Sequence, residues 1–228
     1  MLKKIRRLLS FGLLLISGIL LVWAYLPIKR QVVNLTILPR EMMLPSSGHL
    51  NNPALLENRW VRLEWPSSLR IGDEGVIMLD FEPDPEDIST PNAPTSFSDI
   101  YRGYNLMAEG RFEVAGIAID PNNPIRESLP PGQPVRFKWT ASAAKVGVYF
   151  GNVWFSLRFL PLDGSQATQL PIFVHEVEIQ SISFLGLNGT LARLLGGGGA
   201  LIGVILVLND MIKGWKILSH YKNTNCDA

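Results

Sequence analysis

Apolar residues fill two long segments, one near each end of the chain. Residues 8–28 contain 21 residues without a charge, and a helix of that length spans about 30 Å, the thickness of the hydrocarbon core of a bilayer. Residues 194–212 contain 19 residues, bounded by Arg193 and Lys213, with Asp210 close to the second boundary. We therefore expect a transmembrane helix in each of the two segments.

Between these segments the hydrophobic period shortens to two residues, which is typical of strands with one buried face. Val135, Phe137 and Trp139, for example, share one face of their strand. Turn signals such as Asp163-Gly164 separate successive runs. The pattern predicts an antiparallel β-sandwich over residues 29–182. The expected strands cover residues 32–38, 61–65, 77–82, 101–108, 111–119, 134–141, 147–161 and 166–181, with a bulge near Ala115 and Gly116.

One short motif in the predicted sandwich resembles a pattern found in known proteins. Pro131-Gly132-Gln133 precedes the strand that contains Trp139, and Gly147 precedes the long strand Val153–Phe159. Over residues 130–180 this pattern resembles the immunoglobulin-like domains of uncharacterised two-pass bacterial envelope proteins. The resemblance implies a mainly β chain, with an immunoglobulin-like antiparallel β-sandwich flanked by an N-terminal and a C-terminal transmembrane helix. That family carries no catalytic residues to transfer.

The distribution of charge orients the expected helices. The formal net charge is only +1, but four basic residues lie in residues 1–7 and three in residues 213–228. Because basic residues beside a span stay in the cytoplasm, we expect both tails there, in a cytoplasmic (inner) membrane. Residues 29–182 are then extracytoplasmic, and residues 183–193 form an interfacial segment. The alternative for the first span is a cleaved signal peptide, which also places the following residues outside.

The composition of the extracytoplasmic part argues against nucleic acid as a partner. Residues 29–183 carry 13 Lys and Arg against 18 Asp and Glu, whereas a nucleic-acid-binding domain needs a basic surface. The bilayer and a membrane protein are the partners that we expect.

Small residues recur at helical spacing in the second span. They are Gly196, Gly199, Ala200 and Gly203, and such spacing lets another helix approach closely. The sequence predicts packing against the first helix, a second copy of the chain or a membrane-protein partner. The alternative is a flexible helix that packs poorly.

Residues suited to catalysis are sparse. The single Cys excludes a Cys-based zinc site, and His49, His175 and His220 are too far apart to form a ligand pair. No nucleophile elbow, phosphate loop or dinucleotide-binding motif occurs. We therefore expect no catalytic residue, no cofactor and a non-enzymatic protein. An enzyme that uses carboxylates on strands, such as a glycosidase, is the alternative.

One acidic loop has the composition of a calcium site. Asp84, Glu86 and Asp87 lie close together between prolines, and calcium takes six to eight oxygen ligands in a flexible geometry. The alternative is a solvated loop that keeps the sheet edges soluble, and no EF-hand spacing is present.

A few apolar residues fall where polar residues are expected. Met42, Met43 and Leu44 lie in a long irregular segment, and Trp154 lies on the polar face of its strand. They are candidate partner contacts, or the segment around residues 41–58 covers the core and Trp154. Together these features favour an accessory or scaffold subunit, or a binding module, of a larger membrane or envelope complex. A ligand sensor that relays through the membrane helices is the alternative.

Overall fold

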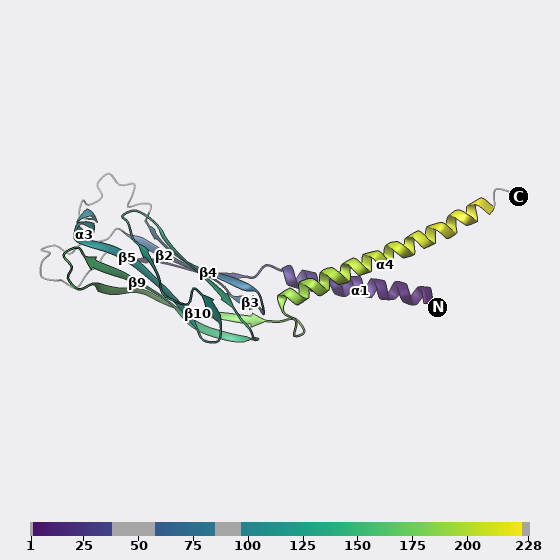
Figure 1. The fold of residues 1–228 in the computed structure, drawn as a ribbon, viewed down its shortest axis with the longest axis horizontal. Coiled ribbons are helices and arrows are strands. Elements are labelled where there is room, and N and C mark those ends of the chain that lie inside the picture. Colours follow the sequence, from purple (N-terminus) through teal and green to yellow (C-terminus); the bar gives the residue numbers. More distant parts are fainter. Residues whose placement is uncertain (1, 38–57, 85–96, 225–228) are drawn as a thin grey trace. The chain divides into compact units, whose positions relative to one another are not determined.

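The computed structural model describes residues 2–37, 58–84 and 97–224 (Figure 1). The chain forms two compact units, which are described separately below. One unit contains residues 28–182, and the other contains residues 1–27 together with residues 183–228. Met42, Met43, Leu44, Glu86 and Asp87, which the sequence singled out, lie outside the described residues.

Residues 28–182 form two five-stranded sheets, which confirms the prediction of a mainly β fold with two sheets. Sheet 1 has the order β1 (Arg30–Ile37), β2 (Arg59–Pro66), β4 (Glu74–Pro83), β8 (Val135–Ser142), β6 (Ala118–Asp120). Sheet 2 has the order β3 (Ser68–Arg70), β10 (Thr168–Ile182), β9 (Gly147–Pro161), β5 (Tyr104–Val114), β7 (Ile125–Ser128). Neighbouring strands are antiparallel except β3 and β10, which are parallel.

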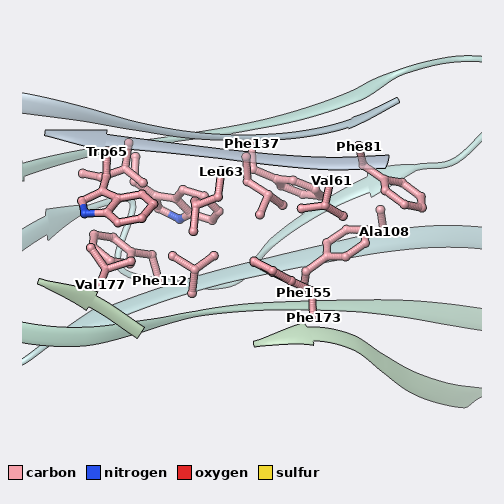
Figure 2. Packing of buried hydrophobic residues seen from close by; sticks show 14 of the residues in the cluster. Val61, Leu63, Trp65, Phe81, Ala108, Phe112, Phe137, Phe155, Phe173 and Val177 are labelled. Carbon is pink, nitrogen blue, oxygen red and sulfur yellow. The ribbon is translucent and has the colours of Figure 1, made fainter. Parts of the chain in front are cut away.

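The core lies between the two sheets (Figure 2). Alternate residues of each strand point inward, so that Val61 and Leu63 of β2 are fully buried, as are Phe81 of β4 and Phe137 of β8. The rings of Phe81 and Phe155, which come from opposite sheets, have centroids 4.7 Å apart. Burial of one such side chain contributes about 1.5–3 kcal/mol, so this contact between the sheets is a main source of stability.

The prediction of two separate strands at residues 101–108 and 111–119 is wrong. A single strand, β5, runs from Tyr104 to Val114, and a short helix, α3 (Phe97–Gly103), precedes it. The expected bulge near Ala115 is a turn in which Gly116 adopts φ +82°. After this turn the chain enters sheet 1, where β6 pairs with β8. The buried parity therefore switches because the chain changes sheets.

Two strands were absent from the sequence prediction. β3 has three residues and β7 has four, and a run that short carries too few alternations to show a period of two. The parallel pairing of β3 with β10 also departs from the expectation of a wholly antiparallel sandwich.

The second unit contains two helices, α1 (Leu2–Tyr25) and α4 (Gly189–Thr224). α1 ends before Pro27, three residues earlier than predicted, because proline cannot continue a helix. α4 begins five residues earlier than the expected span and takes up the end of the segment 183–193. Its cap explains this start, since the backbone N–H of Leu191 donates to Oδ1 of Asn188 at 2.7 Å. Both helices contain stretches long and apolar enough to cross a membrane, Leu8–Tyr25 and Gly189–Asn209.

Candidate interaction surfaces

Three glycines of α4 form a close seam with α1. A Cβ atom at Gly196 would lie 2.9 Å from Cγ of Leu21, and one at Gly203 would lie 2.7 Å from Cγ of Leu14. A Cβ at Gly199 would collide with Oγ of Ser17. Side-chain atoms do not approach this closely, so the absence of a side chain lets the two helices touch.

The glycines of the seam are among the small residues that the sequence predicted to pack against another helix. Gly196, Gly199 and Gly203 face the first helix of the same chain, one of the three alternatives that the spacing allowed. Ala200 is half-buried on α4. Gly197 and Gly198 face open space, because a Cβ atom added at either position would meet no atom within 4 Å.

The rest of the helix surface is apolar and exposed. Leu15 and Ile16 of α1 and Leu201 and Ile205 of α4 are each more than half exposed. A hollow of about 510 Å³ on α1 is lined by Leu8, Leu9, Gly12, Leu13 and Ile16. Most apolar side chains of the helix pair therefore lie outside the seam.

The seam predicts that substitutions at two adjacent glycines have different effects on helix packing and stability. Gly199→Val should push α1 and α4 apart by about 1–2 Å, because interhelical distance follows the side chains at the contact. It should also lower the unfolding free energy by about 1–3 kcal/mol, as overpacking does. Pulsed electron resonance between nitroxides at Leu15→Cys and Ile202→Cys, in a Cys226→Ser background, measures the separation in micelles.

The matched control is Gly198→Val, which adds the same side chain one residue away, into open space. It should leave both the distance and the stability as in the parent. Equal effects of the two substitutions would contradict the seam.

The outer face of sheet 1 carries ion pairs between strands. Nη1 of Arg30 lies 2.8 Å from Oε1 of Glu64, and Nε of Arg136 lies 2.5 Å from Oδ1 of Asp80. Lys138, on the same strand as Arg136, is exposed. This face therefore carries ion pairs beside apolar residues such as Val32, which pairs with Glu64 and is 44% exposed.

The outer face of sheet 2 carries an apolar cluster instead. Val148, Phe150 and Trp154 of β9 and Val174 of β10 are 49%, 55%, 44% and 49% exposed. Val174 pairs with Trp154, and Glu178 pairs with Phe150, so these side chains lie on neighbouring strands. We call the four residues the β9–β10 patch. Trp154 is exposed on the outer face of its strand, where the sequence placed it.

The sequence reasoning missed Val148 and Phe150. Both have the same parity as Trp154 along β9, and both precede it by an even number of residues. This shared parity was the signal that could have found them.

Acidic side chains surround the patch. Glu176 of β10 pairs with Asn152 of β9, which pairs with Glu113 of β5, so the three residues form one row across the sheet. Arg111 forms an ion pair with Glu113. Among the described residues, no Lys or Arg forms an ion pair with Glu176 or Glu178. The surroundings of the patch therefore have an excess of negative charge.

At the other end of the same face, two arginines surround one carboxylate. Oε2 of Glu109 lies 2.6 Å from Nε of Arg126 and 3.4 Å from Nη1 of Arg158. Gln169 donates to Oε1 of Glu109 at 3.4 Å and to Oγ of Ser156 at 2.8 Å. Burial by itself raises the pKa of the Glu109 carboxyl, but the hydrogen bond and charge of Arg126, with those of Arg158, outweigh it. The pKa of Glu109 therefore lies below its ordinary value of 4.5.

Glu109 predicts a pH dependence of stability. A carboxyl whose pKa is lowered by folding stabilises the folded state above its unfolded pKa and loses that contribution as pH falls through its folded pKa. Glu109→Gln should therefore be less stable than the parent at about pH 7, and the difference should shrink as the pH falls to about 3. Thermal melting across this range gives the comparison.

Glu127→Gln on the neighbouring strand β7 is the control, because among the described residues no ion pair involves Glu127. A constant difference between Glu109→Gln and the parent at every pH would show that the arginines do not act on this carboxylate.

The remaining candidate residues have structural surroundings. Asp84 directly follows β4, and its backbone N–H donates to the carbonyl of Asn58 at 2.8 Å. No group of three His, Cys, Asp or Glu side chains able to hold a metal occurs in the part of the chain that the structure describes, and calcium binding stays a prediction. His175 is half-buried, with its ring centroid 5.3 Å from that of Trp65 and 5.8 Å from that of Phe173.

Comparisons with known proteins do not assign a family. No protein-family model matches the chain, and no curated protein matches its sequence. Among solved structures, PapD-like domain 7 of human CEP192 is 13% identical with a TM-score of 0.33, and the match covers 62% of this chain and 99% of that domain. The major fimbrial subunit AggA of Escherichia coli is 7% identical with a TM-score of 0.28, covering 68% and 96% of the two chains.

A PKD domain of an M14-like peptidase from a Thermoplasmatales archaeon is 14% identical with a TM-score of 0.24, covering 52% and 89%. TM-scores this low carry no argument about this chain. Its two-sheet fold rests on its own strand pairing.

Proposed function

We propose that this chain is a non-enzymatic, membrane-anchored protein of the bacterial envelope that acts as an accessory subunit or binding module of a larger membrane complex. In this proposal α1 and α4 cross the cytoplasmic membrane as a hairpin, with both tails in the cytoplasm. The sandwich, of immunoglobulin-like type, lies on the outer side.

The exposed apolar surface of the helix pair carries the proposal. Side chains such as Leu15 and Leu201 lie outside the seam and are more than half exposed. Apolar surface in contact with water costs about 25 cal/mol per Å², and lipid removes that cost along the whole length of a helix. The tails supply the orientation, because their basic residues favour the cytoplasmic side.

The sandwich supports the binding part of the proposal. Its two outer faces differ, since one carries inter-strand ion pairs and the other exposes the aromatic rings of Phe150 and Trp154. Exposed aromatic side chains on a rigid surface are typical of protein interfaces. A sheet face held by two long neighbouring strands, β9 and β10, meets this description.

The proposal is tested on the full chain in its own membranes. We expect the chain to stay in the membrane pellet after alkaline carbonate washing, since only bilayer insertion resists that treatment. After mild-detergent purification, native mass spectrometry should show a stoichiometric partner protein. A peripheral protein that marks the washed-out fraction serves as the control.

Release by carbonate would contradict the membrane anchor. A lone monomer in every mild detergent tested would contradict the accessory role while leaving the anchor intact.

A further inference from the structure

We propose that the β9–β10 patch is the docking site for a basic protein segment, one that presents Lys or Arg side chains around an apolar centre. This inference deepens the proposed function and rests on it, because it names the surface and the chemistry of the partner. The patch consists of Val148, Phe150, Trp154 and Val174.

The position of the patch singles it out from the rest of the sandwich surface. Phe150 and Trp154 are the large aromatic side chains that the outer face of sheet 2 exposes, and Val148 and Val174 extend the apolar surface along and across the strands. Sheet 1 meets solvent with ion pairs such as Arg136 with Asp80. An apolar, aromatic cluster with a polar rim is the arrangement found at the centre of protein interfaces.

The rim determines the sign of the partner's charge. Glu113, Glu176 and Glu178 border the patch, and Arg111, which pairs with Trp154 across β5 and β9, forms an ion pair with Glu113. Complementary potentials steer association and fix the register of an interface, and like charges placed opposite one another oppose it. The surface therefore favours a partner with positive charge facing Glu176 and Glu178.

The same charges disfavour the other occupants. Anionic lipid headgroups and nucleic acid carry negative charge and would be repelled by the rim. A second copy that used the same face would bring the same negatively charged rim against its own, since a two-fold interface uses the same surface on both subunits. A basic segment of a different protein is the occupant that the charges support.

The patch is also held in place before a partner arrives. On one side β9 pairs with β5 over residues 151–161, which include Trp154, and on its other side it pairs with β10 over residues 147–159, which include Val148, Phe150 and Trp154. The Glu109 cluster fixes the far end of the same face through Arg126 and Arg158. Little backbone order has to be gained on binding, which favours affinity.

The test uses a photo-reactive benzophenone amino acid in place of Asn152, between Phe150 and Trp154, in the full chain in its own membranes. The same amino acid in place of Lys138, an exposed position on sheet 1, is the control. We expect a cross-linked adduct from position 152 and none from position 138. Mass spectrometry of the adduct should identify a peptide of another protein that contains Lys or Arg.

Charge reversal then tests the rim. Glu176→Lys combined with Glu178→Lys should lower the adduct yield by about tenfold, and the milder pair Glu176→Gln and Glu178→Gln should lower it less. Glu127→Lys, which makes the same change on β7 of the same sheet, should leave the yield unchanged. All variants alter exposed residues, and thermal melting confirms that each is folded as the parent is.

Four results would overturn the inference. They are no adduct from position 152, an adduct with lipid or with another part of the same chain, an adduct with an acidic peptide, and a yield that charge reversal does not lower. If the chain still co-purifies with a stoichiometric partner in any of these cases, the proposed function stands and the docking surface lies elsewhere.

Discussion

Exclusion of apolar surface from water is the constraint on which the rest of this structure depends. Within the sandwich the two sheets meet this constraint together, because Phe81 and Phe155 fill the space between them. The helix pair cannot do the same, since its seam is built from glycines that bury little side-chain surface. The two backbones approach each other closely at the seam, but the leucines and isoleucines of both helices lie mostly outside it. A helix pair of this kind needs an apolar medium around it, which is the basis of the membrane anchor that we propose.

The same constraint explains why the apolar residues of the β9–β10 patch are unusual on an exposed sheet face. A sheet with one solvated face normally alternates apolar and polar residues, and the ion pairs on the outer face of sheet 1 agree with that rule. β9 departs from this alternation at Phe150 and Trp154, whose apolar rings are exposed to water. In the docking that we propose, a partner of opposite charge covers this surface, and the acidic rim keeps it soluble until then.

The sequence predicted the two longest strands well, because each carries several repeats of its period. Strand β9 has the bounds that the alternation indicated, and β10 differs by two residues at its start and one at its end. Short or locally capped features were missed, since β3 has three residues and the start of α4 depends on the side chain of Asn188. Glycine spacing predicted a helix contact, but the partner helix could be identified only from the packing of Leu14, Ser17 and Leu21. Likewise, the row Glu176–Asn152–Glu113 depends on strand register, which a single sequence does not give.

The most direct measurement of the central claim is the side of the membrane on which each part of the chain lies. Cys226 is the only cysteine, so a membrane-impermeant maleimide reports on the C-terminal tail without any substitution. Gln166→Cys in a Cys226→Ser background reports on an exposed loop of the sandwich. In intact cells stripped of any outer barrier, we predict labelling at position 166 and none at Cys226 until the membrane is permeabilised. Labelling of Cys226 in intact cells, or protection of position 166, would contradict a hairpin anchor with the sandwich outside.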